Sequence, residues 1–153
     1  MASVKQLGNA GGSIGMIVRV MAICCALSAY SVGAQTLEGP VTHVRDGDTI
    51  EVNGIAVRLR GVNCEEWGRP RGRQATEQMI QLTRGKHANC SLNGERTGDR
   101  VVGWCSVDGR DLGETLIRDA ICSRCARYDP ELRYVDAQRA AGAWTGAVPR
   151  YCK

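Results

Sequence analysis

The sequence predicts an α+β domain, mainly β, in which a small and strongly bent antiparallel sheet carries helices at one end. Short strands are predicted by alternating apolar and polar residues in the first part of the domain. Between two of them lies Asn53-Gly54, a strong hairpin signal because both residues tolerate positive φ. Apolar residues at helical spacing are inserted between strands and then follow them. Five short strands would suit a closed OB-type barrel, although strand spacing alone does not establish closure.

The five strands are predicted at residues 39–44, 49–52, 55–60, 86–92 and 100–107. A period of two places Arg58 on the face of its strand opposite to Val57 and Leu59. Turns are predicted at Asp46-Gly47-Asp48 and at Asp108-Gly109, with longer loops at residues 65–72 and 93–98.

Three helices are predicted. The first carries Ala75, Met79, Ile80 and Leu82 on one face and ends before Gly85. The second begins after Asp111, which resembles a capping box with Glu114. The third is predicted to begin at Asp129-Pro130, as N-cap and first helical residue, and to end at Gly142.

Residues 1–34 are predicted to be a signal peptide. Lys5 and Arg19 supply positive charge, Val20–Tyr30 is an apolar run, and Val32-Gly33-Ala34 offers the small residues of a cleavage site. The run is shorter than the roughly 20 residues of a membrane-spanning helix. An uncleaved anchor is the alternative, and a lipoprotein is disfavoured because Ile23 precedes Cys24.

Cleavage would leave one nuclease-sized domain, residues 35–153, in the periplasm or outside the cell. We expect a monomer without stable membrane association. Lys5 and Arg19 leave with the signal, so 18 basic residues face 16 acidic ones. That balance is too small to establish a polyanionic partner.

Six cysteines remain in the mature chain, and an even number in an exported domain predicts disulfides. They are Cys64, Cys90, Cys105, Cys122, Cys125 and Cys152. Cys90 and Cys105 fall on neighbouring antiparallel strands, which predicts a bridge between them. Cys122-x-x-Cys125 fits either a redox pair or structural bridges, and the absence of a strand–helix context favours the structural bridges.

The candidate site is a cluster of acids and an arginine between Val44 and Glu66. Asp46, Asp48 and Glu66 lie within about twenty residues of one another, and Arg58 lies between them. Hairpin geometry could fold them together. Acids and arginine around a cleft are the chemistry of a phosphate ester held by a cation. The alternatives are a plain turn with solvated acids and an exposed polar strand face.

Several motifs, in this order and spacing, resemble the staphylococcal nuclease family in a secreted bacterial form, from about Val41 to Trp144. They are Asp46-Gly47-Asp48-Thr49, Arg58-Leu59-x-Gly61-Val62, Glu66, Asp99-Arg100-Val101-Val102 and Asp108-Gly109. The resemblance implies a five-stranded OB barrel with three helices. It also implies Ca²⁺-dependent hydrolysis of phosphodiesters in DNA and RNA.

The resemblance implies a metal site around Asp48, a Ca²⁺ ligand, with Asp46 as a nearby outer acid and Thr49 in support. Asn63 stands where a second Ca²⁺-binding aspartate is usual. Cys64 replaces a threonine whose backbone carbonyl is a ligand, and that carbonyl survives the change. Because calcium affinity depends on ligand charge, Asn63 should weaken metal binding.

The resemblance also implies catalytic roles. Glu66 would be the general base, or would orient the attacking water, and Arg58 and Arg100 would grip the phosphate. Tyr128 matches one of two substrate-contacting tyrosines, whereas Ala126 stands at the position of the other.

The favoured function is an exported phosphodiesterase acting on nucleic acid. The alternative from another class is a catalytically weak binding or interaction module of the same fold, which Asn63 and Ala126 keep open. A small disulfide protein without a nucleic-acid role is a third reading. The basic run Arg69–Arg73 fits a solvated loop or a nucleic-acid groove. His43 and His87 lack the spacing of zinc ligands.

Overall fold

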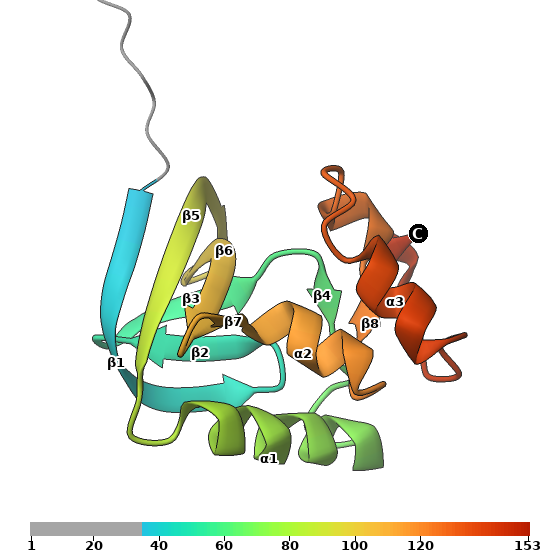
Figure 1. Ribbon diagram of the computed structural model, residues 1–153, viewed down its shortest axis with the longest axis horizontal. Helices are drawn as coiled ribbons and strands as arrows, with labels where there is room; N and C mark the ends of the chain where they lie inside the picture. Colours follow the sequence, from blue (N-terminus) through green and yellow to red (C-terminus); the bar gives the residue numbers. More distant parts are fainter. Residues whose placement is uncertain (1–34) are drawn as a thin grey trace, which may run out of the picture. The chain divides into compact units, whose positions relative to one another are not determined.

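The computed structural model describes residues 35–153 (Figure 1). The predicted signal peptide, residues 1–34, lies outside the described residues, and that prediction stays untested. The strands are β1 Gln35–Asp46, β2 Thr49–Val52, β3 Ile55–Leu59, β4 Val62–Asn63, β5 His87–Thr97, β6 Arg100–Val107, β7 Arg110–Asp111 and β8 Ser123–Arg124. The helices are α1 Pro70–Thr83, α2 Leu112–Arg118 and α3 Val135–Ala141, with 3₁₀ turns η1 Ala126–Tyr128 and η2 Arg150–Cys152. No helix of the described part is long and apolar enough to cross a membrane.

Five strands form a ring. The sheet order is β3-β2-β1-β5-β6-β7, and β3 also pairs in parallel with β6, with Val57 opposite Val101 and Leu59 opposite Gly103. The remaining pairs among these five strands are antiparallel. The prediction of a mainly-β α+β fold with three α-helices is confirmed. The finer assignment to the OB type stays a prediction.

The Asn53-Gly54 hairpin forms as predicted, with φ of 52° and 76°. This turn sets the register of β2 against β3, in which Thr49 lies opposite Arg58. Because Asp48 directly precedes β2, the same register brings its carboxylate beside the Arg58 guanidinium. A local turn signal therefore positions the first two side chains of the site.

The core fills the space between the ring and the helices. α1 packs against β1, and α2 packs against β6 and α3. The largest fully buried side chains are Tyr134, Ile50, Leu59, Met79, Leu112, Leu116 and Ile117. Burial of each large apolar side chain stabilises the fold by about 1.5–3 kcal/mol relative to exposure.

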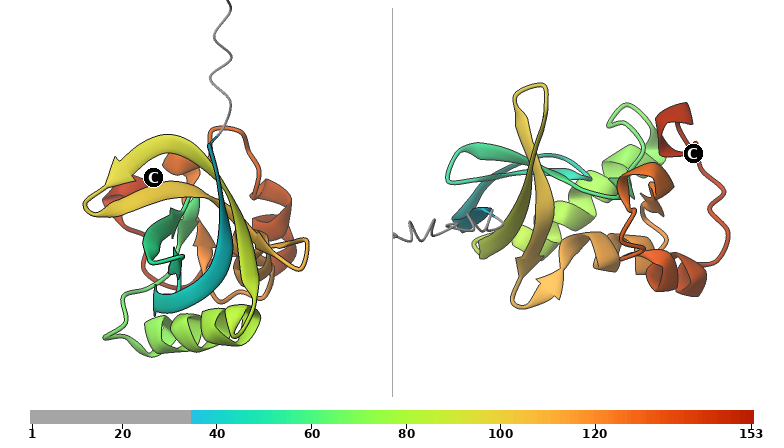
Figure 2. Two further views of the ribbon diagram at one scale, coloured as in Figure 1. Left: turned by 90° about the vertical axis from the view of Figure 1, so that its left-hand side faces the viewer. Right: turned by 90° about the horizontal axis from the view of Figure 1, so that it is seen from above.

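The C-terminal elements lie beside the ring, as the view from above in Figure 2 shows. Two-residue strands β4 and β8 pair with each other and join the segment after α2 to the segment after β3. These strands were not predicted, because two residues carry no periodicity.

Two predicted boundaries are wrong. β5 continues to Thr97 through a register irregularity after Leu92, where the sequence predicted a loop at 93–98. Gly94, with φ of 82°, accommodates the irregularity, and Thr97 pairs with Arg100 to extend the hairpin.

The third helix begins at Val135 and not at Pro130. The buried Asp129 carboxylate accepts hydrogen bonds from the backbone N–H groups of Arg133 and Tyr134. Leu132 adopts a positive φ of 58°, which no α-helix contains. Asp129 thus closes a turn ahead of the helix, which ends at Gly142 as predicted.

Three disulfides join the six cysteines. The predicted Cys90–Cys105 bridge is confirmed, with an S–S distance of 2.03 Å. The other two are Cys64–Cys122 and Cys125–Cys152. The two cysteines of Cys122-x-x-Cys125 therefore belong to different bridges, and the structural reading of that motif is confirmed.

Candidate active site

One cleft of about 600 Å³ gathers most of the predicted site residues. Those on its walls are Asp46, Asp48, Arg58, Cys64, Glu66, Arg100 and Tyr128. They come from the ends of four strands, the loop after β4 and the η1 turn. Residues up to 82 positions apart in sequence therefore meet at one surface, although the structure does not test their individual roles.

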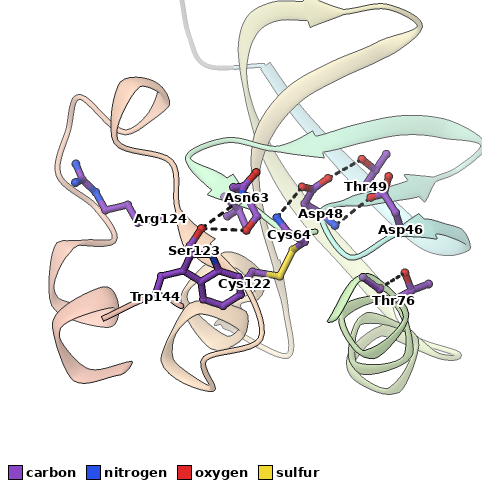
Figure 3. The surroundings of a disulfide bond; sticks show 12 residues. Asp46, Asp48, Thr49, Asn63, Cys64, Thr76, Cys122, Ser123, Arg124 and Trp144 are labelled. Atoms are coloured by element: carbon purple, nitrogen blue, oxygen red, sulfur yellow. Dashed lines mark hydrogen bonds between the residues drawn. A yellow bond between two sulfur atoms is a disulfide. The ribbon is translucent and has the colours of Figure 1, made fainter. Parts of the chain in front are cut away.

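Asp48 is the buried centre of the cleft, only 3% exposed. One carboxylate oxygen accepts from the Arg58 guanidinium and from the Thr49 hydroxyl, the latter at 3.2 Å. The other accepts from the Cys64 backbone N–H at 3.2 Å (Figure 3). Burial raises the pKa of Asp48 to about 6, against the lowering effect of Arg58.

The Asp46-Gly47-Asp48 turn is fixed from both sides. The Asp46 carboxylate accepts from the Asp48 backbone N–H at 3.1 Å, which closes the turn. A Cβ at Gly47 would lie 2.4 Å from the Ala75 Cβ on α1 and 3.1 Å from the Cys64 sulfur. Only glycine lets the turn approach the helix and the Cys64–Cys122 bridge this closely.

The two predicted arginines enter the cleft from different strands. Arg58 lies at the end of β3 and also donates to the Val62 carbonyl at 3.4 Å. Arg100 begins β6 and donates to the Thr49 hydroxyl at 3.4 Å. Thr49 thus links Arg100 to Asp48, which agrees with its predicted supporting place beside the acid.

Glu66 lies on the loop after β4, with its side chain exposed at the cleft. Its backbone carbonyl accepts from the Arg69 N–H at 2.9 Å just ahead of α1. A Cβ at Gly72 would lie 1.9 Å from this same carbonyl oxygen. The first turn of α1 therefore packs directly on the backbone that carries Glu66.

Asn63 lies away from the cleft wall. Its side-chain N–H₂ donates to the Ser123 hydroxyl at 3.3 Å and to the Ala147 carbonyl at 3.4 Å (Figure 3). These bonds tie β4 to β8 and to the C-terminal loop. Its predicted role as a metal ligand stays a prediction.

The donor chemistry of the cleft fits Ca²⁺ in a reduced form. Ca²⁺ prefers carboxylate, carbonyl and water oxygens, and the cleft offers the Asp46 and Asp48 carboxylates with Glu66 nearby. Within residues 35–153, however, no three His, Cys, Asp or Glu side chains are close enough together to form a metal-binding group. A cation here would therefore take several of its oxygens from water or substrate.

The cleft also contains residues that the sequence did not single out. Tyr151, on the C-terminal η2 turn, lies beside Tyr128, and Arg96 lies near the end of β5. Arg60, expected on an exposed strand face, pairs with Glu131 at 3.1 Å and lines the cleft as well. Tyr151 lies in a tail without periodicity, so only its neighbour Cys152 signalled that this tail is held in place.

Part of the Arg69–Arg73 run has a structural partner. The Arg71 guanidinium lies over the Trp144 ring, 4.7 Å from its centroid, and donates to the Thr145 hydroxyl at 2.8 Å. Arg71 therefore holds the C-terminal loop against α1. A groove role for the run stays a prediction.

Comparison with known proteins finds relatives with nuclease names. The chain is 27% identical over 131 residues to an uncharacterized endonuclease of Escherichia coli, covering 79% of this chain and 86% of that protein. It is 26% identical over 109 residues to the probable staphylococcal-like nuclease CAN1 of Oryza sativa subsp. japonica, covering 68% and 33%. An uncharacterized 38.1 kDa protein of Capnoides sempervirens is 28% identical over 122 residues, covering 76% and 35%. The chain thus spans about a third of the length of the two plant relatives. No protein-family model matches the chain.

A ring of strands whose cleft gathers acids and arginines, together with these relatives, defines a nuclease-like α+β protein. Within that class, the predicted resemblance is confirmed: the chain is similar to the staphylococcal nuclease-like family.

Proposed function

We propose that the protein is an exported phosphodiesterase that hydrolyses DNA and RNA internally, as an endonuclease. The observation that supports it most is the meeting of Asp48, Arg58, Arg100 and Glu66 in one cleft. A pure binding surface has use for the arginines but no use for an acid free to accept a proton. The nuclease names of the relatives point to the same class of substrate.

The two arginines would bind the scissile phosphate. They come from β3 and β6, so they approach it from different sides with charge-assisted hydrogen bonds. Arg58 is already fixed by Asp48, and Arg100 by Thr49. Donors that are fixed before the reaction stabilise the added negative charge of the transition state without reorganising during it.

Glu66 would activate the attacking water. Its exposed carboxylate takes a proton from the water, whose oxygen then forms the new bond to phosphorus. The bond from phosphorus to the ester oxygen breaks, and that oxygen leaves with a proton from solvent. Asp48, Asp46 and the Cys64 carbonyl would hold a Ca²⁺ ion, with Asn63 as a further oxygen donor. When bound, the ion offsets phosphate charge and lowers the pKa of coordinated water.

The experiment is a cleavage assay on the mature chain with single-stranded DNA and with RNA, each with Ca²⁺ or a chelator. Glu66→Gln and Arg100→Ala serve as matched variants, since both side chains reach the cleft from its surface. We expect the chelator and each substitution to reduce cleavage at least a hundredfold. Equal cleavage by all three proteins would trace the activity to a contaminant and reject the proposal.

A second candidate function is a catalytically weak module that binds nucleic acid or another partner. Two observations favour it: the Asp48 carboxylate already has three protein donors, and the Asn63 amide donates to Ser123 and Ala147. Both reduce what remains for a cation. Tight binding of DNA by wild type without any cleavage would favour the module over the enzyme.

Export, a monomeric state and an OB-type barrel complete the proposal. Export is supported by the three disulfides, which persist in oxidising compartments. The barrel is supported by the closed pairing of β3 with β6.

A further inference from the structure

Two tyrosines from separate 3₁₀ turns border the cleft. Tyr128 ends η1 and is 42% exposed, and Tyr151 lies within η2 and is 47% exposed. Their ring centroids are 6.5 Å apart, with planes at 59°. The rings therefore touch at a tilt and leave aromatic surface facing solvent at the cleft, rather than packing into the core.

A disulfide fixes this pair. Cys125 immediately precedes η1, and Cys152 follows Tyr151 directly; both sulfurs are buried in the bridge, whose Cα atoms are 4.5 Å apart. η2 contributes no other buried side chain. The bridge is therefore the main attachment that keeps Tyr151 at the cleft.

The surroundings of the pair are cationic on the side of the ring. Arg58, Arg96 and Arg100 line the same cleft as the two tyrosines. Aromatic surface beside guanidinium groups matches the two parts of a nucleotide, because a base stacks on a ring while its phosphate pairs with arginine. An exposed aromatic pair within a charged cleft thus has a ligand-binding geometry that scattered surface residues lack.

We propose that Tyr151 and Tyr128 together bind a nucleobase of the nucleic-acid substrate, and that the Cys125–Cys152 disulfide holds Tyr151 in position for it. The inference rests on the proposed function for the class of substrate, but it concerns binding and not cleavage. A base stacks on the outward face of one ring while the second ring borders its edge. Tyr151 is a substrate-binding residue, and the bridge is its positioning element.

The test measures binding with the mature chain carrying Glu66→Gln, so that the probe stays intact. The probes are a fluorescein-labelled octamer of deoxythymidylate and an octamer of abasic residues with the same phosphates, followed by fluorescence polarisation. We expect Tyr151→Ala to raise the Kd for the thymidylate octamer about fivefold or more and to leave the Kd for the abasic octamer within about twofold. Tyr151→Phe keeps the ring and should bind as the parent does.

Ile55→Ala is the matched control, because Ile55 is 45% exposed and does not line the cleft. It should change neither Kd. Equal weakening of both probes by Tyr151→Ala would mean a charge or folding effect, and no weakening of either would mean no contact. Either result overturns the base-binding role.

The tether is tested with Cys125→Ser/Cys152→Ser, after circular dichroism shows that the ring remains folded. We expect it to raise the Kd for the thymidylate octamer as Tyr151→Ala does, with no further rise when the two are combined. Unchanged binding by the folded double variant would overturn the tether. If wild type binds thymidylate through its bases but never cleaves, the nuclease proposal fails while this inference stands.

Discussion

The strand ring and the C-terminal segment, residues 119–153, are stabilised by different interactions. The ring with α1 and α2 holds most of the apolar core, including Ile50, Leu59 and Met79. The C-terminal segment adds few buried apolar side chains, Tyr134 and Ala137 among them. It is attached instead by disulfides and by polar contacts such as the one from Arg124 to Asp129.

This difference separates two tasks at the cleft. The ring carries Asp48, Arg58 and Arg100, which the proposed chemistry needs in fixed positions. The attached segment carries Tyr128 and Tyr151, which would contact the substrate beyond the phosphate. A small exported domain can thus place substrate contacts on a segment that its own core is too small to hold.

The largest effect should come from removing the bridge between the two regions. Cys64→Ala/Cys122→Ala opens a link across 58 residues, which in the chain-entropy description costs about 4 kcal/mol. Urea unfolding measures the loss. Hydrogen exchange should show amides of residues 119–153 losing protection before those of the ring.

The ring's own bridge is the matched control. Cys90→Ala/Cys105→Ala opens a link across only 15 residues and should cost about 3 kcal/mol. Its sulfurs are equally buried, so the loss of packing is similar in both variants. A larger loss at Cys90–Cys105 than at Cys64–Cys122 would contradict the assignment of the second bridge as the link between regions.

The next effect lies within the ring. Arg58→Ala should lower the free energy of unfolding by about 3 kcal/mol, because it leaves the buried Asp48 carboxylate without its cation. We take the low end of the range for broken buried pairs because the Arg58 side chain is 20% exposed. Chemical denaturation measures the change.

A second substitution tests the cause. Asp48→Asn added to Arg58→Ala removes the unpaired charge and should recover part of the lost stability without restoring cleavage. Additive losses in the double variant would show that the two side chains do not depend on each other.

The sequence predicted those parts of the molecule that local signals determine. Asn53-Gly54 set the register that brings Asp48 to Arg58, and facing strand positions predicted Cys90–Cys105. Positive φ at a turn and period-two alternation act within a few residues, so they can be recognised without tertiary information.

The contacts that close the cleft depend on distant partners. Cys64–Cys122 forms across a pair of two-residue strands that carry no pattern. Asp129-Pro130 has a helix-start signal, yet the Asp129 carboxylate is used by Arg124, Arg133 and Tyr134 in a turn. Tyr151 reaches the cleft only because Cys152 is bridged to Cys125. Each outcome follows from tertiary competition that local propensity cannot express.

The third prediction concerns how the ring's helix positions Glu66. Gly72→Ala forces the Glu66 carbonyl to move, since the new Cβ would lie 1.9 Å from its oxygen. A displacement near 1 Å of a catalytic group costs about a hundredfold in kcat. Gly68→Ala in the same loop is the control, because its Cβ would meet no atom within 4 Å. Steady-state cleavage should show a reduced kcat for Gly72→Ala alone, and equal rates for both variants would contradict the positioning role of α1.

The smallest effect tests the polar attachment of the C-terminal segment at alkaline pH. Burial, reinforced by Asp111, raises the pKa of the Tyr134 phenol well above its ordinary value of 10. Its hydroxyl donates to the Asp111 carboxylate at 3.1 Å, so the folded state keeps the proton. The unfolded chain releases that proton above pH 10. The contribution of this group is therefore complete below pH 10 and falls as pH rises further.

By pH 11 the folded protein should lose about 1 kcal/mol through this one group. Unfolding by urea at pH 9 and at pH 11, without thiols and within minutes, measures the loss. Tyr134→Phe is less stable at both values because it lacks the bond to Asp111, but it should lack this part of the pH dependence. Tyr128 and Tyr151 are exposed and ionise alike in both states, so they leave the comparison unchanged. An identical fall in stability for wild type and Tyr134→Phe would show that the hydroxyl is accessible to solvent and that packing, not this polar contact, holds α3 to α2.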